Sequence, residues 1–185
     1  MPSKIYVDNS NYYLCGLDQA KESGNPHLVG SDYKALYDML TFGEAPRCAR
    51  IYSARRPGGN EFDHERARQA GFEVVLAERV MGREKGVDAS LAIALLSDSY
   101  ELHQPGDLVI LVAGDLDYVP AVQNLRKRGI EVYVAFWSSG LAIKLAKVAT
   151  KVVCLDGHLR TLMRPARRRV APAAAAEHRQ EFPIA

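Results

Sequence analysis

The sequence predicts a three-layer α/β/α fold in which helices cover both faces of a mainly parallel central sheet. Short β-branched runs alternate along the chain with amphipathic segments of about ten residues, the pattern of repeated strand–helix–strand units. The run Leu108–Ala113 is apolar without alternation, as expected for a strand that helices cover on both faces. The length of 185 residues allows one domain of ordinary size.

Strands are expected where short aliphatic runs stand between polar segments. β-branched and other aliphatic residues are enriched in strands. In chain order, the predicted strands are Lys4–Val7, Ala49–Ser53, Phe72–Leu76, Leu108–Ala113, Ile130–Phe136 and Lys151–Leu155.

Helices are expected between these strands, over segments whose apolar residues recur at helical spacing. Ser31 is the predicted N-cap of the first helix. Gly71 and Gly129 are predicted to end two others, because glycine readily takes the left-handed conformation after a helix. The predicted helices are Asp32–Phe42, Glu61–Ala70, Asp88–Tyr100, Val119–Arg128, Leu141–Val148 and Gly157–Met163.

The predicted domain covers residues 1–160, and residues 161–185 are predicted to be a mobile tail rich in Arg, Ala and Pro. This stretch offers little apolar area to bury. It carries five arginines and two glutamates, whereas the other 160 residues hold 19 basic and 20 acidic side chains. The net charge of +2 therefore does not indicate a basic surface, and a nucleic-acid partner has to be inferred from local sites.

Several classes of protein are excluded by what the sequence lacks. No apolar run approaches the roughly 20 residues that span a bilayer, and the first residues do not resemble a signal peptide. The three cysteines are widely spaced, which argues against a zinc site or a disulfide framework and favours a reducing cytoplasm. No GxGxxG or GxxxxGK stretch occurs, so a nucleotide cofactor is not expected.

Acidic residues follow two predicted strands and begin one predicted helix. Asp8 ends the first strand, Asp115 and Asp117 follow the apolar strand, and Asp88 begins the apolar helix. In an open parallel sheet, ligands bind beyond the carboxyl ends of the strands, so these acids are expected at one edge. Carboxylates packed together repel one another, and a divalent cation with oxygen ligands, Mg²⁺ or Mn²⁺, removes that conflict.

Each acid also has a purely structural interpretation. Asp8 and Asp88 could each serve as the N-cap of a following helix, since Asp is a good capping residue. A turn favours Gly and Asp, but two acids directly after a buried strand are an unusual choice for a turn alone. Taken together, the placement of the acids favours a metal site that hydrolyses a phosphodiester, because a metal ion lowers the pKa of an attacking water and stabilises the leaving oxygen.

Three segments resemble the NYN domain, a branch of the PIN-like nuclease superfamily. They are Tyr6-Val7-Asp8-Asn9-Ser10-Asn11, Glu84-Lys85-Gly86-Val87-Asp88 and Ala113-Gly114-Asp115-Leu116-Asp117-Tyr118-Val119-Pro120, in the family's order and spacing. The resemblance covers about residues 3–160 and implies a PIN-like fold with metal-dependent ribonuclease activity. It also implies that Asp8, Asp88, Asp115 and Asp117 are the catalytic and metal-binding acids, that Asn11 orients the first of them, and that Lys85 meets a phosphate.

The sequence departs from the family pattern at two positions. Many members have a further Asp about six residues after the acid that begins the helix, where this chain has Ala94. Near the last strand, where members often read Ala-Asp, this chain has Ala149-Thr150. The first departure leaves open a weakened second metal site.

Basic and polar residues near the same edge offer a path for RNA. Arg55 and Arg56 follow the second predicted strand and could bind a phosphate backbone, where affinity is mostly electrostatic; an ordinary solvated loop is the alternative. Ser138, after the fifth strand, could hydrogen-bond a phosphate, or it could be part of a plain turn.

The sequence therefore predicts a cytoplasmic, metal-dependent endoribonuclease that cuts RNA, with single-stranded RNA favoured because an exposed strand can bend into an acidic cleft. One or two Mg²⁺ or Mn²⁺ ions are the expected cofactors. The alternative is an RNA-binding or regulatory module on the same fold, with weak or no catalysis.

Overall fold

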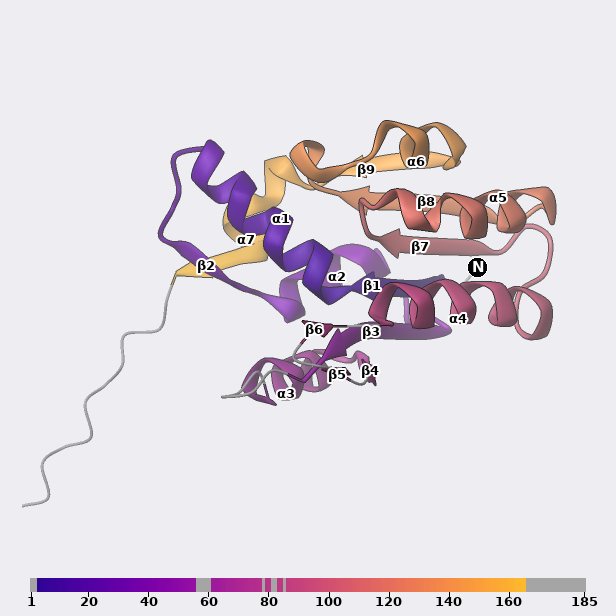
Figure 1. Cartoon of the computed structure of the whole chain (residues 1–185), viewed down its shortest axis with the longest axis horizontal. Coiled ribbons are helices and arrows are strands. Elements are labelled where there is room, and N and C mark those ends of the chain that lie inside the picture. Colours follow the sequence, from indigo (N-terminus) through magenta and orange to yellow (C-terminus); the bar gives the residue numbers. More distant parts are fainter. Residues whose placement is uncertain (1–2, 56–60, 78, 81–82, 85, 166–185) are drawn as a thin grey trace, which may run out of the picture.

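The computed structural model describes residues 3–55, 61–77, 79–80, 83–84 and 86–165 (Figure 1). Its centre is a six-stranded sheet in the order β4-β3-β1-β7-β8-β9, and every neighbouring pair of strands in it is parallel. The strands are β1 (Lys4–Asp8), β3 (Cys48–Ala54), β4 (Glu73–Ala77), β7 (Leu108–Val112), β8 (Glu131–Phe136) and β9 (Lys151–Cys154).

Helices cover both faces of this sheet, which confirms the predicted three-layer α/β/α fold. One face carries α4 (Val87–Glu101), α5 (Val119–Lys127) and α6 (Ile143–Val148), which pack side by side. The other carries α1 (Asn9–Glu22), α2 (Tyr33–Thr41), α3 (Glu61–Ala70) and α7 (Leu159–Leu162). This division follows from the right-handed crossover between parallel strands.

Short elements complete the part of the chain that the structure describes. Three single 3₁₀ turns, η1 (Leu116–Tyr118), η2 (Ser138–Gly140) and η3 (Asp156–His158), follow β7, β8 and β9. Two further pairs of short strands lie outside the main sheet: β2 (Leu28–Ser31) pairs with β10 (Met163–Pro165), and β5 (Arg79–Val80) pairs with β6 (Arg83–Glu84).

The strand order places a switch point between β1 and β7. From β1 the chain adds β3 and β4 on one side, whereas β7, β8 and β9 extend the other side. At such a point the two connections leave in opposite directions, and a crevice opens beyond the carboxyl ends of the strands. Val7 faces both Ile51 and Val112 in register, so Asp8 and the residues after β7 flank that crevice.

The core is built from the apolar strands that the sequence predicts. Val109, Ile110, Leu111 and Val112 are all 0–1% exposed, as expected for a strand covered on both faces. The lone tryptophan also belongs to the core: Trp137 stacks on Tyr12 with ring centroids 5.6 Å apart, and its Nε1 donates to the Tyr12 carbonyl at 2.9 Å.

Two predictions about the elements need correction. The helix α1 was not expected, yet it directly follows β1. The N-cap of α2 is Asp32, whose side chain accepts from the Ala35 amide at 3.0 Å, whereas Ser31 ends β2 and is buried. Asp32 takes the cap because β2 extends through Ser31.

The predicted boundary between domain and tail lies too early in the chain. Residues 161–165 are part of the fold, since α7 and β10 include them, and β10 pairs antiparallel with β2. Arg164 donates from Nε to the Ser31 carbonyl at 3.0 Å. Residues 166–185 lie outside the described residues, so the prediction of a mobile tail concerns only them.

Candidate active site

The first acid of the site, Asp8, ends β1 and caps α1. Its Oδ1 accepts from the backbone N–H of Asn11 at 3.0 Å, so the capping interpretation holds for this residue. Its Oδ2 accepts from the hydroxyl of Tyr118 at 2.8 Å. Asp8 is only 1% exposed, and the capping bond and the phenol together fix a carboxylate that has little contact with water.

The second acid, Asp88, lies in the first turn of α4. Its Oδ1 is 3.4 Å from the Tyr118 hydroxyl, which therefore stands between two carboxylates. A phenol has one proton to donate, and Asp8 receives the shorter bond. The N-cap of α4 is Gly86, at φ 94°, so the interpretation of Asp88 as an N-cap is wrong. Asp88 is exposed, and its carboxylate does not cap the helix.

The third acid, Asp115, follows Gly114, a glycine that is in close contact with α1, with β8 and with the segment after η2. The Gly114 amide donates to Asn11 Oδ1 at 2.7 Å, and the Gly114 carbonyl accepts from the Ala142 amide at 2.8 Å. A Cβ on Gly114 would lie 2.3 Å from the Gly140 carbonyl oxygen and from the Phe136 ring. Only glycine fits there, and Asp115 is thereby held at the carboxyl end of β7.

These three acids line one pocket of about 220 Å³, together with Ser10, Asn11, Leu14 and Val87. No basic side chain is among these lining residues. Asp8 and Asp88 come from β1 and α4, and Asp115 from the turn after β7, so segments from three parts of the chain supply the pocket.

The acids do not form a finished coordination shell. Within the described residues, no group of three or more His, Cys, Asp or Glu side chains lies close enough to hold a metal ion as it stands. The donor set still fits Mg²⁺ or Mn²⁺, because the acidic ligands are all hard oxygens. Mg²⁺ commonly keeps several waters and takes only one or two carboxylates directly, and the pocket has room for such a hydrated ion.

Burial governs the electrostatics of Asp8. Desolvation raises the pKa of its carboxyl from 3.8 to about 6, and the nearby Asp88 charge adds to the increase. The hydrogen bonds from Asn11 and Tyr118 act in the opposite direction but do not outweigh burial. Ionised Asp8 is therefore costly in the folded protein unless a cation is close by.

Asn11 contributes in a different way from the one the family resemblance implies. Its backbone, not its side chain, donates to Asp8, whereas its side-chain oxygen accepts from Gly114. The side chain therefore holds the segment that carries Asp115. Asp117 is exposed and does not line the pocket, but its backbone N–H donates to Asp115 Oδ1 at 3.2 Å.

The predicted substrate contacts are dispersed. Arg55 is exposed and lines a separate pocket with His64 and residues of α3. Ser138 lines neither the acidic pocket nor the hollow beside it, because its hydroxyl and backbone N–H both donate to the Asp156 carboxylate; this engagement speaks against the predicted phosphate contact. Arg56 and Lys85 lie outside the described residues.

Tyr118 is the site residue that the sequence reasoning missed. It is fully buried, and its hydroxyl reaches two of the three acids. The signal that could have found it is its position three residues after Asp115. From a single helical turn there, a tyrosine side chain can reach back to the end of the preceding strand. A buried tyrosine hydroxyl nearly always has a hydrogen-bond partner.

A second hollow adjoins the acidic pocket. It measures about 360 Å³ and shares Asn11 and Asp115 with the first. Its remaining lining residues come from the turns after β7 and β8: Gly114, Leu116, Ser139, Gly140, Leu141 and Ala142. The acids therefore sit at one end of a longer depression along the edge of the sheet.

Comparisons with known proteins agree with this architecture. The family model of the NYN domain matches residues 3–156. The chain resembles the crystal structure of a protein of unknown function from Vibrio parahaemolyticus, with a TM-score of 0.70 and 22% identity over 88% of this chain and 96% of that one. A search of curated proteins gave no match. None of the described helices combines the length and apolarity needed to cross a bilayer.

Proposed function

The chain belongs to the NYN domain family, and from this premise we propose that it is a metal-dependent endoribonuclease acting on single-stranded RNA. The observation that carries the proposal is the meeting of Asp8, Asp88 and Asp115 in one pocket at the switch point of the sheet, where α/β proteins bind their ligands.

The charge of the pocket supports a cation as the partner of the substrate. A phosphate cannot approach three carboxylates without one, because like charges at short range repel strongly. Among the described residues, no basic side chain lines the pocket to offset them. A bound Mg²⁺ or Mn²⁺ would supply the positive charge and would lower the pKa of an attacking water.

The residues then have separate tasks in this proposal. Asp8, Asp88 and Asp115 hold the ion. Tyr118 fixes the carboxylate of Asp8 through its hydrogen bond. We keep Asp117 as a candidate ligand through water, since its exposed carboxylate is two residues from Asp115. Lys85, with Arg55 or Arg56, remains proposed to position RNA, whereas Ser138 is no longer included.

The test is cleavage of an end-labelled single-stranded RNA with Mn²⁺, with Mg²⁺ and with EDTA. Wild type should cut internally with either ion and stop in EDTA. Asp115→Asn should lose cleavage because it removes one metal ligand. Asp38→Asn is the matched control, because it neutralises an exposed acid on α2 that pairs with Lys34. Cleavage that persists in EDTA, or that survives Asp115→Asn, would refute the proposed chemistry.

One observation favours a second candidate, an RNA-binding module without catalysis. The acids do not converge to ligand distance among the described residues, and Ala94 stands where many family members have a further Asp. This candidate predicts binding of the same RNA in filter assays with no cleavage under any metal condition, and no thermal stabilisation by Mn²⁺.

A further inference from the structure

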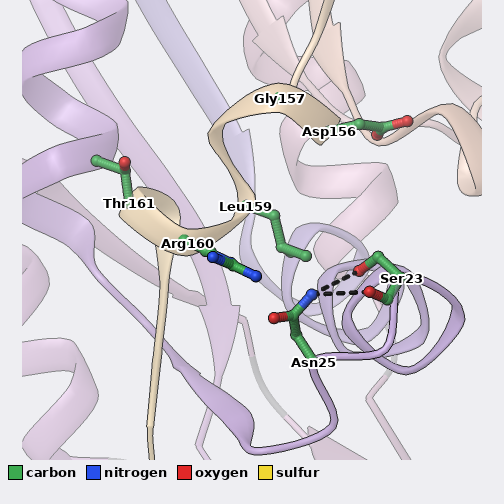
Figure 2. Close-up of a pocket in the computed structure, with 7 residues that line it drawn as sticks. All are labelled: Ser23, Asn25, Asp156, Gly157, Leu159, Arg160 and Thr161. Carbon is green, nitrogen blue, oxygen red and sulfur yellow. Dashed lines mark hydrogen bonds between the residues drawn. The ribbon is translucent and has the colours of Figure 1, made fainter.

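A third hollow lies at the same edge of the sheet, beyond the two already described. It measures about 220 Å³ and forms between the end of α1 and the segment that follows β9 (Figure 2). Its lining residues are Ser23, Asn25, Asp156, Gly157, Leu159, Arg160 and Thr161.

 The side chains of Leu159 and Arg160 both face this hollow, and Asn25 and Ser23 face them from the end of α1 (Figure 2).

The three hollows follow the order of the strands. The acidic pocket lies at the ends of β1 and β7, the second hollow at the turns after β7 and β8, and the third at the segment after β9. The turn η2 lies between the second and third hollows: Ser139 lines the second, and its neighbour Ser138 donates to Asp156 of the third. The three hollows therefore form a row along this edge, with Arg160 at its far end.

Arg160 is the cationic group of this third hollow. It is exposed, and among the described residues its side chain has no hydrogen-bond or ion-pair partner. Asp156 lines the same hollow but is engaged elsewhere: both of its oxygens accept from Ser138, and its carboxylate points away from Arg160 (Figure 2). Burial tends to raise the pKa of Asp156, but the Ser138 hydrogen bonds outweigh it and keep the pKa below its ordinary value.

The distance from the three acids to Arg160 determines how long a ligand must be to contact both. Three strand spacings of about 4.8 Å separate β1 from β9, on the order of 15 Å along the edge. The helix α1 runs between the same two places, and its 14 residues span about 21 Å. A ligand that touches both ends must be a chain of several nucleotides, not a mononucleotide.

We propose that Arg160 binds a backbone phosphate of the RNA strand several nucleotides away from the bond held at the acidic pocket. This inference rests on the proposed function and extends it, because it gives the substrate a direction along the edge and a minimum length. Arg160 carries the planar fork of donors that suits a phosphate, and it supplies a positive charge that no described lining residue of the acidic pocket provides.

The test compares Arg160→Gln with Arg47→Gln in the full chain. Arg47 is the matched control: it is exposed, its side chain has no partner among the described residues, and it precedes β3 at the opposite edge of the sheet. Each variant is assayed on a 12-nucleotide single strand and on a dinucleotide, by single-turnover cleavage with Mn²⁺ over a range of protein concentrations. Filter binding of the longer RNA in EDTA at 50–200 mM salt is measured in parallel.

For Arg160→Gln on the longer RNA, we expect a roughly three- to tenfold higher half-saturating protein concentration, an unchanged rate at saturation, and a salt slope shallower by about 0.7, the value for one phosphate on a single strand. The dinucleotide should be cut as by wild type, and Arg47→Gln should change nothing. Equal losses on both substrates, equal losses in both variants, or no loss at all would each overturn the proposal.

The two proposals fail in different ways. If wild type cuts no RNA with Mn²⁺, the proposed catalysis is wrong, and the filter-binding series still decides the role of Arg160. An unchanged salt slope in Arg160→Gln overturns the phosphate contact whether or not the protein is a nuclease.

Discussion

Replacing Asp8 with asparagine should stabilise the metal-free protein at neutral pH while abolishing the proposed cleavage of RNA. The Asp8 carboxyl is buried, and its pKa is raised from 3.8 to about 6 in the folded state. A group whose pKa is higher in the folded state than in the unfolded state contributes its full stability at pH values below the unfolded-state pKa. That stability is lost as the pH rises through the folded-state pKa. The asparagine can still accept from the Asn11 amide and donate to the Tyr118 hydroxyl, but it carries no charge.

The size of the effect follows from the two pKa values. They differ by about two pH units, and each unit corresponds to about 1.4 kcal/mol, so wild type should lose about 3 kcal/mol of unfolding free energy through Asp8 between pH 4 and pH 7. In EDTA, the advantage of Asp8→Asn should therefore grow from near zero at pH 4 to about 3 kcal/mol at pH 7.

Urea unfolding of both proteins in EDTA, at several pH values from 4 to 8, measures this difference. All other titratable groups are common to both proteins, so the difference between the two curves isolates Asp8. With Mn²⁺ at 100 times its dissociation constant, wild type should regain about 2.7 kcal/mol, and the variant should gain much less. A stability difference that stays constant with pH would refute the reasoning.

Three further predictions concern packing and hydrogen bonding. Gly114→Ala should lower the unfolding free energy by about 1–3 kcal/mol because its Cβ has no space; thermal melts should show no comparable loss for Gly157→Ala, whose Cβ would meet nothing within 4 Å. Tyr118→Phe should cost about 1 kcal/mol and slow single-turnover cleavage at saturating Mn²⁺, because one acid loses its hydrogen bond; an unchanged rate would contradict its positioning role. Asp98→Ala should cost about 3 kcal/mol in urea unfolding because it removes the carboxylate that accepts from the buried Tyr6 hydroxyl and one of the two carboxylates paired with Arg50. Asp38→Ala, at an exposed pair, should cost less than 1 kcal/mol.

The parallel sheet could be predicted because its strands are short, largely apolar runs, which local sequence shows without long-range information. The central strands β1 and β7 are buried on both faces, whereas the edge strands β4 and β9 are partly exposed. The helix α3 was predicted with the bounds that the structure shows. The helix α1 was missed because Asn9, Ser10, Asn11 and Gly16 are weak helix formers. Contacts distant in sequence stabilise it instead: at Gly16 a Cβ would lie 3.1 Å from Met163 Sδ.

The candidate site likewise has a part that the sequence predicts and a part that it does not. The acids were found because strand ends in a parallel sheet share an edge, so sequence position alone brings Asp8 and Asp115 together. The exact donors were not predictable, since the bond between Asn11 and Gly114 joins residues 103 positions apart. The Tyr118 hydroxyl likewise reaches Asp8 across 110 positions, and no local pattern encodes which of its neighbours a buried phenol will meet.

The pairing of β2 with β10 has a consequence for the order of events during synthesis. Arg164 binds the Ser31 carbonyl across 133 residues, and the neighbouring α7 packs on α1, the helix that Asp8 caps. A ribosome adding 5–20 residues per second needs on the order of ten seconds to cover that interval. Throughout that time the strand β2 and one side of α1 lack their partners. The helix that begins after Asp8 therefore gains its last packing partners only once residue 165 has left the exit tunnel, although it is among the first elements to be synthesised.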